Sequence, residues 1–443
     1  LTALTADAME TLNISGDQNL TITDALDFQG TGVYAGTVDA STMTGGLTLN
    51  LSTAENVSVK GGSGDDAFNF AETLNKSDLV DGGDGTADKI ELRVAAQTID
   101  ATASTGELIG VTNVENIQIA STNNAAVLDL DGFTGVTTVT AAAATVQTVG
   151  TTAGSSQVFT FALDGVTLTA TDAATNTTTT SATAIAAAIN AYGKGYSATS
   201  DTAVVTITSS NGDSGNLTGE TGGTIAVTQA ALTDVSFANL AGTEAVDIYS
   251  ADQVAVTLKD ASGTADSMTV NIKTGSLSKG IAQTVGEVVV ENTETLTIDS
   301  SGLTTGIANT LTTLTGGVAL TTLNVTGDSN LTATGLSGNT KLATIDATTF
   351  TGDLSVDSSA TLNQTITGGK GNDTFAMGAN LNNGDVLDGG SNTVIPATGV
   401  LGEDLVTATV TGLTSATGAL SVANVERLNL TNNGTAVIDA TAI

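Results

Sequence analysis

Two short stretches of the chain combine glycines with an acidic residue at a fixed spacing. They are residues 61–69, GGSGDDAFN, and residues 368–376, GGKGNDTFA, and both follow the pattern G-G-x-G-x-D-x-U-x, in which U is apolar. The glycines permit a tight turn with inward-facing carbonyl groups, the Asp adds a carboxylate oxygen, and the apolar residue starts a buried strand. Because hard cations prefer such oxygen ligands, the two stretches predict calcium-binding turns.

Each stretch is followed by a companion turn. A second glycine pair begins 21 residues after the first glycine of each copy, in residues 81–83 and 388–390, both DGG. In the first copy the companion turn, residues 82–90 (GGDGTADKI), is one residue longer than the pattern. In the second copy it runs into a loop with Pro396, and the pattern resumes only at Asp404. Because both copies have a second glycine pair at the same distance, a chance match to the nonapeptide pattern is disfavoured.

These turns resemble the RTX (repeats-in-toxin) nonapeptide family. In that family, consecutive turns of a parallel β-roll stack on one another and hold Ca²⁺ between them. The copies in a regular roll follow each other directly, whereas here 21 residues separate a turn from its companion. The resemblance therefore implies isolated calcium turns set in other β structure rather than a long roll.

The expected calcium ligands are side-chain and carbonyl oxygens of these turns, which together would supply about six to eight oxygens per ion. The side chains are Asp65, Asp66, Asp84 and Asp88 in the first copy and Asn372, Asp373, Asp388 and Asp404 in the second. The carbonyl groups are those of Gly62, Gly64, Gly83, Gly369 and Gly371. Asp17 and Asp328, in two matched turns, are secondary candidates, and their alternative role is to form those turns as Asx caps.

The composition limits the kinds of partner and chemistry. With 46 acidic and 11 basic residues, the formal net charge is -35, which bound divalent cations would partly neutralise. Such a charge excludes nucleic acid as an expected partner, although acidity alone can also serve solubility. The chain has no Cys and no His, so it lacks thiolates and the commonest general base, and no enzyme is expected. No apolar run reaches the roughly 20 residues of a membrane helix.

Repeated strand motifs organise the chain. The motif E-x-h-x-h, with h apolar, predicts a half-buried strand and begins at Glu10, Glu55, Glu115, Glu244, Glu294 and Glu426. A second motif, D-x-x-x-[F/M]-T-G, covers residues 39–45, 129–135 and 346–352, and its Phe or Met is expected to plug the solenoid end of a turn. Residues 12–20 (LNISGDQNL) match residues 323–331 (LNVTGDSNL), and the second motif and a calcium turn follow both. One module is used twice.

Stacked turns of this kind predict a mainly β protein, an elongated right-handed parallel β-helix or β-solenoid with RTX-type calcium turns. A different segment interrupts it and predicts a small α+β insertion domain of ββαββ order, similar to small modules of flagellins and other bacterial surface proteins. The expected domains are residues 1–149, 150–232 and 233–443. The elements expected in the insertion are strands at 158–161 and 166–168 around a turn at Asp164 and Gly165, a helix at 182–191 between Ser181 as its cap and Gly193, and strands at 203–208 and 224–228.

The two ends suggest a fragment of a longer protein. The chain begins with Leu1, and it stops at residues 439–443 (DATAI), which read as the start of the second motif without its Thr-Gly.

The acidic, Cys-free, Thr-, Ala- and Gly-rich composition with scattered calcium turns resembles the RTX-type surface-layer (S-layer) proteins of Gram-negative bacteria. The resemblance implies a structural subunit that leaves the cell through type I secretion and folds on meeting extracellular calcium. It then assembles with copies of itself into a two-dimensional lattice on the bacterial cell surface. Its implied partners are calcium and other copies of the chain, and any contact with cell-surface polysaccharide is expected in regions outside this chain.

Three other functions share some of these features with an S-layer subunit. A stalk or binding section of a secreted RTX adhesin shares the calcium turns, but adhesin extenders are usually near-identical tandem domains, whereas these two copies diverge. An extracellular polysaccharide lyase or epimerase on a β-helix is disfavoured because the chain has no His, no Trp and few basic residues. Ice binding by ladders of Thr is disfavoured because no regular T-x-T spacing persists.

Overall fold

The structure of the protein is a computed structural model that divides into two compact units. The first comprises Leu1–Ala238 with Gly275–Ser278, and the second comprises Asn239–Thr274 with Lys279–Ile443. The sequence-predicted bounds at 149 and 232 stay a prediction. The structure describes residues 1, 4, 9–28, 30, 34–52, 56–71, 73–94, 98–99, 110–121, 126–143, 145–150, 157–163, 166–172, 177–192, 196–209, 217–221, 224–229, 234–249, 251–273, 282–302, 308–358, 360–391, 402–410 and 420–432.

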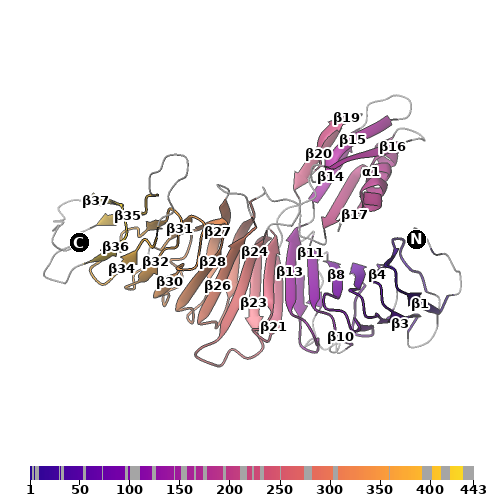
Figure 1. Ribbon diagram of the computed structural model, residues 1–443, viewed down its shortest axis with the longest axis horizontal. Coiled ribbons are helices and arrows are strands. Elements are labelled where there is room, and N and C mark those ends of the chain that lie inside the picture. The colour runs from indigo at the N-terminus through magenta and orange to yellow at the C-terminus, as the bar shows by residue number, and fades with distance from the viewer. Residues whose placement is uncertain are drawn as a thin grey trace. The chain divides into compact units, whose positions relative to one another are not determined.

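The first unit contains short parallel strands that alternate between sheets along the chain (Figure 1). Their bounds are β1 (Thr11–Gly16), β2 (Leu20–Ile22), β3 (Gly36–Met43), β4 (Leu47–Asn50), β5 (Val57–Lys60), β6 (Ala67–Ala71), β7 (Leu79–Asp81), β8 (Lys89–Val94), β9 (Thr98–Ile99), β10 (Val111–Thr112), β11 (Asn116–Ser121), β12 (Ala126–Asp129), β13 (Thr138–Ala143) and β21 (Asp234–Leu240), whose last two residues already belong to the second unit. One sheet has the order β1-β3-β5-β7-β10, another contains β2-β4-β6-β8-β11-β13, and β12 pairs with β9 and β21.

The second unit repeats this alternation between two sheets. Its strands are β22 (Ala245–Tyr249), β23 (Ala251–Leu258), β24 (Ser267–Lys273), β25 (Thr284–Val290), β26 (Thr295–Ser301), β27 (Ala308–Thr315), β28 (Thr322–Gly327), β29 (Asn330–Ala333), β30 (Thr344–Asp346), β31 (Leu354–Asp357), β32 (Thr365–Thr367), β33 (Thr374–Ala376), β34 (Val386–Asp388), β35 (Leu405–Val410), β36 (Ser421–Ala423) and β37 (Arg427–Asn432). The even-numbered strands run in the order β22 to β36 in one sheet, and the odd-numbered strands run from β23 to β37 in the other.

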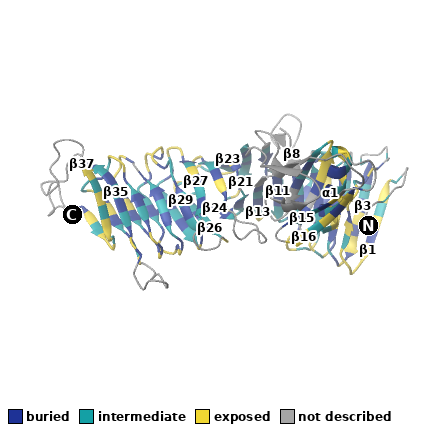
Figure 2. Ribbon diagram, turned by 90° about the horizontal axis from the view of Figure 1, so that it is seen from above, coloured by how far each residue is buried: buried dark blue, intermediate teal, exposed yellow. Residues whose placement is uncertain are grey.

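The protein is therefore mainly β with long parallel sheets, as the sequence predicts and as a β-solenoid requires. All six E-x-h-x-h motifs form strands, namely β1, β5, β11, β22, β26 and β37. In β26, Leu296 and Ile298 are buried and lie opposite Leu323 and Val325 of β28, so apolar side chains stack in columns inside the unit. Figure 2 shows the same alternation of buried and less buried residues along β35.

The second motif behaves as expected at two of its three positions. Met43 and Phe350 are buried inside their turns, whereas Phe133 is only partly buried. The first Asp of each copy accepts a hydrogen bond, through its Oδ1, from the amide two residues later. Asp346 Oδ1, for example, lies 3.0 Å from the Thr348 nitrogen.

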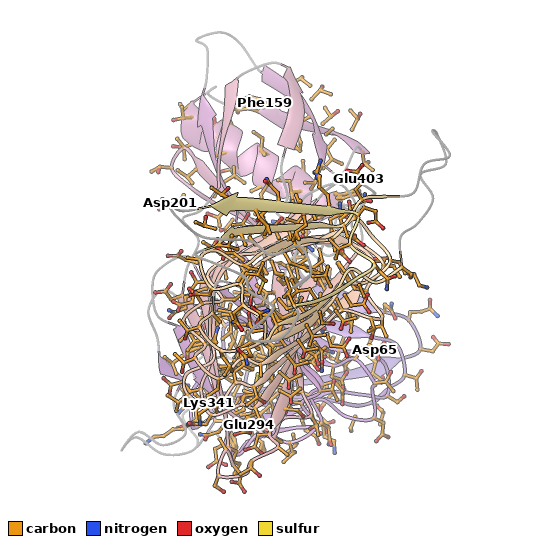
Figure 3. All side chains as sticks on the ribbon, turned by 90° about the vertical axis from the view of Figure 1, so that its left-hand side faces the viewer. Asp65, Phe159, Asp201, Glu294, Lys341 and Glu403 are labelled. Carbon is orange, nitrogen blue, oxygen red and sulfur yellow. The ribbon has the colours of Figure 1, made fainter. Side chains whose placement is uncertain are left out.

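The segment between the repeated modules forms antiparallel structure around one helix, the only helix among the described residues. Its elements are β14 (Thr145–Gly150), β15 (Gln157–Leu163), β16 (Val166–Asp172), α1 (Thr178–Tyr192), β17 (Tyr196–Asp201), β18 (Val204–Ser209), β19 (Leu217–Thr221) and β20 (Thr224–Gln229). The sheets are β17-β18-β14-β20 and β16-β15-β19. The helix packs against β16, β17 and β18 over a core that includes Phe159, which is labelled in Figure 3.

Two expectations for this segment are wrong. Four strands follow the helix where two were predicted, because β17 and β19 are rich in Ser, Thr and Gly and lack a clear apolar alternation. The helix begins at Thr178, not at Ala182, and Thr177 caps it: the Thr180 nitrogen donates to Thr177 Oγ1 at 3.2 Å. Ser181 lies inside the helix and donates to Asp172 Oδ2. The expected turn residues Asp164, Gly165 and Gly193 lie outside the described residues.

No helix in the described ranges is long and apolar enough to span a membrane.

Candidate metal-binding turns

The predicted calcium turns connect one parallel sheet to the next within each unit. Residues 61–66 join β5 to β6, residues 82–88 join β7 to β8, and residues 113–115 join β10 to β11. Because β5 pairs with β7, and β6 with β8, successive turns lie one above the other. The Asp84 nitrogen accordingly donates to the Gly62 carbonyl at 2.8 Å, and in the second unit the Ser391 nitrogen donates to the Gly369 carbonyl at the same distance.

The acidic residue of each nonapeptide closes its own turn and reaches the preceding one. Asp66 Oδ2 accepts from the Gly62 nitrogen, and its Oδ1 accepts from the Leu47 nitrogen, both at 2.7 Å. Asp373 does the same with the nitrogen atoms of Gly369, at 2.7 Å, and Leu354, at 2.9 Å. Both side chains are buried. Each of these carboxylates is therefore held by two amide donors.

The next turn contributes a second acid, and the turn after that contributes a third, directly before a strand. The Asp66 nitrogen donates to Asp88 Oδ1 at 2.7 Å, and the Asp88 nitrogen donates to Glu115 Oε2 at 2.8 Å. The second unit repeats both bonds, each at 2.7 Å. We call each chain of acids a carboxylate relay. The relays are Asp66, Asp88 and Glu115 in the first unit and Asp373, Asp404 and Glu426 in the second.

A shorter relay was not predicted. The Asp266 nitrogen donates to Glu294 Oε2 at 2.9 Å, the same bond that joins Asp88 to Glu115 (Glu294 is labelled in Figure 3). The turn before Asp266, residues 263–266, has the sequence GTAD, which is identical to residues 85–88. In the sequence, the Glu of E-x-h-x-h stands out only as part of a strand motif. Its position directly before the strand, together with the repeated GTAD, was the available signal.

Asp65 and Asn372 occupy equivalent places beside the relays. Asp65 Oδ1 accepts from the nitrogen atoms of Thr86 and Ala87, both at 3.1 Å, so it caps the turn above. Asn372 Oδ1 accepts from the Glu403 nitrogen at 3.0 Å (Asp65 and Glu403 are labelled in Figure 3). Asp84, by contrast, is exposed and meets the turn below through its backbone.

Asp388 differs from its predicted counterpart. Its Oδ1 accepts from the Gly390 nitrogen at 3.0 Å and from Asn424 Nδ2 at 2.8 Å. The residue that makes these bonds in the first unit is Asp81, which accepts from Gly83 and Asn113. Asp388 therefore corresponds to Asp81, and Asp404 corresponds to Asp88.

The predicted glycines permit close stacking of the turns. A Cβ on Gly64 would overlap the backbone of Gly45, and one on Gly371 would overlap the carbonyl group of Gly352. Gly83 has a φ of +106°, a conformation that other residues rarely adopt. Gly62 and Gly369 use their carbonyl oxygens to accept from the turn above, as described.

The secondary candidates Asp17 and Asp328 lie in the turns after β1 and β28 and do not join the relays. Asp17 Oδ1 accepts from Gln18 Nε2 at 3.2 Å. Asp328 Oδ1 accepts from the Gly302 nitrogen and from Ser329 Oγ, both at 3.2 Å.

Another duplicated pair of acids lies in the loops that lead to β7 and β34. Asp78 accepts from the nitrogen atoms of Val57, at 2.8 Å, and Asn75, at 2.7 Å. Asp385 accepts from the Gln364 and Asn382 nitrogens, both at 2.8 Å. Burial raises the pKa of both carboxyl groups. The sequence pattern gave no indication of either.

Burial makes the relays electrostatically costly without a cation. Loss of hydration is the main reason that the pKa of Asp88 is raised to about 7. The negative charges of Asp66 and Glu115 contribute to this rise, and the hydrogen bond from the Asp66 amide opposes it. Loss of hydration also raises the pKa of Asp373 to about 6 and that of Asp66 above its usual value. Among the described residues, no Lys or Arg forms an ion pair with these three carboxylates.

The oxygen atoms of the relays are suitable ligands for a hard cation, although no group of three acidic side chains surrounds a single point in the described ranges. All the side-chain groups are carboxylate or amide oxygens, and Asp88 Oδ2 is buried with no hydrogen-bond partner in the described part of the chain. Nowhere in the described ranges do three or more acidic side chains gather in a group that could hold a metal ion. A bound ion would thus combine one carboxylate per turn with backbone carbonyl groups.

No family model, curated protein or solved structure matches this chain. The residues of the turns alone therefore support the functional inference.

Proposed function

We propose that this chain is the lattice-forming part of a structural S-layer subunit of a Gram-negative bacterium, which folds and assembles on binding extracellular calcium. The observation that supports the proposal is the duplicated carboxylate relay. Each relay places two buried aspartates one turn apart within a parallel sheet structure. Buried carboxylates are tolerated when they are paired or bind a metal ion.

Calcium would supply the missing positive charge. A site filled to about 100 times its dissociation constant stabilises the folded state by about 2.7 kcal/mol. A few such sites equal the stability of a typical domain, roughly 5–15 kcal/mol. The chain would therefore stay unfolded where calcium is scarce, as type I secretion requires, and fold outside the cell.

The same ion favours assembly between copies. A net charge of -35 makes copies of the chain repel one another, and divalent cations shared between acidic surfaces reduce this repulsion. We place the protein outside the cell, on the bacterial surface, as a structural protein and not an enzyme. We also infer that the crossovers between its parallel strands are right-handed, as nearly all such connections are.

Negative-stain microscopy and light scattering during a calcium titration test this function, with magnesium and EDTA as controls. We expect two-dimensional sheets that form with calcium and dissolve in EDTA. Folding with calcium into particles that never form sheets would instead support the stalk of an RTX adhesin. Indifference of folding and assembly to calcium would contradict both.

A further inference from the structure

The two successive turns of the first unit differ by one residue, and this difference changes their hydrogen bonding. In the shorter turn, residues 61–66, the Gly62 nitrogen donates to Asp66 Oδ2 at 2.7 Å. The equivalent amide of the longer turn, residues 82–88, belongs to Gly83. It donates instead to Asp81 Oδ1 at 3.2 Å, the last residue of β7.

The consequence is a carboxylate oxygen without a donor. Asp66 uses both oxygens to accept amides, whereas Asp88 uses only Oδ1. Asp88 is 0% exposed, and its Oδ2 has no hydrogen-bond partner among the described residues. A buried acceptor left without a donor costs about 1–3 kcal/mol, and more when it is charged.

A second oxygen faces the same place. A Cβ on Gly82 would overlap the Asn113 carbonyl oxygen and would lie 2.7 Å from Asp88 Oδ2. The two oxygens therefore converge on the side of Gly82 where other residues carry a side chain. Asn113 holds its carbonyl there from a left-handed backbone conformation, with a φ of 51°, that Asn adopts more readily than most residues.

We propose that the cation-binding carboxylate of the first unit is Asp88 and not the nonapeptide residue Asp66. A hard divalent cation, calcium under the function proposed above, binds between residues 82–88 and Asn113 through Asp88 Oδ2 and the Asn113 carbonyl group. Asp66 is a positioning residue: its two amide bonds hold the turn together, and its own amide orients Asp88 through Oδ1.

The second unit repeats the arrangement. A Cβ on Gly389 would overlap Asp404 Oδ2 and the carbonyl oxygen of Asn424, whose φ is 49°. The Gly390 amide is again taken by the preceding acid, Asp388. A buried Oδ2 with no partner in the described ranges also recurs at Asp266, in the second GTAD turn. The assignment extends to Asp404 by this equivalence.

The test compares Asp88→Asn with Asp66→Asn in the full chain. Native mass spectrometry counts the calcium ions bound per chain, and thermal unfolding is measured in EDTA and in calcium. Asn keeps an oxygen acceptor but removes the charge, so Asp88→Asn should raise the midpoint in EDTA and bind one ion fewer than the wild type. Asp66→Asn should lower the midpoint in EDTA, because one of the two amides that donate to Asp66 loses its acceptor. It should keep the wild-type number of ions, because Asp66 is not a ligand in this assignment.

Four other outcomes would overturn the assignment to Asp88. They are an unchanged ion count in Asp88→Asn, a lower midpoint of this variant in EDTA, an ion lost only in Asp66→Asn, and an ion lost in both variants. Should Asp66→Asn not fold, the ion count of Asp88→Asn alone decides. A wild-type chain that binds no calcium would refute the proposed function as well, whereas these four outcomes leave that function standing.

Discussion

At the scale of residues, identical side chains have different environments in neighbouring turns. Asp66 and Asp88 are both buried aspartates next to a strand, yet Asp66 accepts two amide hydrogen bonds and Asp88 accepts one. The nonapeptide string identifies where such an acid lies. The length of the turn determines how many oxygens of this acid accept a hydrogen bond from a backbone amide.

The raised pKa values predict how the metal-free protein responds to pH. An acid whose pKa is higher in the folded than in the unfolded state binds its proton more tightly when folded, so stability falls as pH rises between the two values. For Asp88 this interval runs from 3.8 to about 7. In EDTA, the free energy of unfolding should decrease between about pH 4.5 and pH 7.5, by at most about 4 kcal/mol from Asp88.

Urea denaturation in EDTA at the two pH values measures this slope. Asp88→Asn should flatten it, and the matched control Asp260→Asn, at a fully exposed acid, should leave it in place. A slope that is the same in Asp88→Asn as in the wild type would contradict the pKa assignment. With calcium bound, the slope should shrink or reverse, because the ion favours the charged carboxylate.

A glycine substitution tests the close stacking of the turns. In Gly61→Ala the new Cβ overlaps the Gly82 carbonyl group, which is backbone and cannot rotate away, and also Asp66 Oδ2. We expect a loss of about 3 kcal/mol of stability, the upper part of the usual range for overpacking. Gly338→Ala is the control, since its Cβ meets nothing within 4 Å and its change should stay within about 0.5 kcal/mol. Equal midpoints for both variants in thermal unfolding would contradict the stacking.

At the scale of elements, the strands can be predicted from the sequence, but the carboxylates that accept hydrogen bonds from the amides at their starts cannot. Alternation of apolar residues is a local property, so every E-x-h-x-h motif was recognised as a strand. The acceptor for an amide at a strand start lies in a later turn, as for Asp266 and Glu294, which are 28 residues apart. No local pattern reports a contact across that separation. The candidate site was accordingly located in sequence, while the roles of its acids were not.

The helix start illustrates a second limit. Residues 177–181 (TTTTS) are all possible caps, and their local propensities are too similar to choose among them. The structure selects Thr177, which leaves Thr180 and Ser181 to bond to Asp172 of β16. Tertiary contacts with a strand therefore decide where the helix begins.

This choice of cap can be checked with two variants. Thr177→Ala should cost about 1 kcal/mol, because the Thr180 amide loses its side-chain acceptor. Thr183→Ala, at an exposed position inside the helix, should cost less, since Ala is the better helix former. Hydrogen exchange of the helix amides is the measurement. Faster exchange in Thr183→Ala than in Thr177→Ala would show that the cap lies elsewhere.

At the scale of the whole molecule, the charge predicts a distinct response to each salt. Monovalent salt screens the repulsion of a chain with a net charge of -35, so NaCl at about 0.5 M should raise the thermal midpoint in EDTA. About 5 mM CaCl₂ should raise it further, because specific sites add to screening. MgCl₂ at the same concentration should act mainly through screening, since Mg²⁺ demands a stricter geometry. Equal midpoints in calcium and magnesium would contradict specific calcium sites.

The relays also determine the order in which their hydrogen bonds can form when the chain is exported from one end. In every link, the amide belongs to the earlier residue and the carboxylate to a later one: Leu47 to Asp66, Asp66 to Asp88, and Asp88 to Glu115. If the chain leaves a narrow export channel with its amino terminus first, each amide emerges before the carboxylate that accepts its hydrogen bond. The bond then cannot form until that later acid has also emerged. If the carboxyl terminus leaves first, each carboxylate emerges before the backbone amide that donates to it. Vectorial folding of this protein therefore proceeds differently from its two ends.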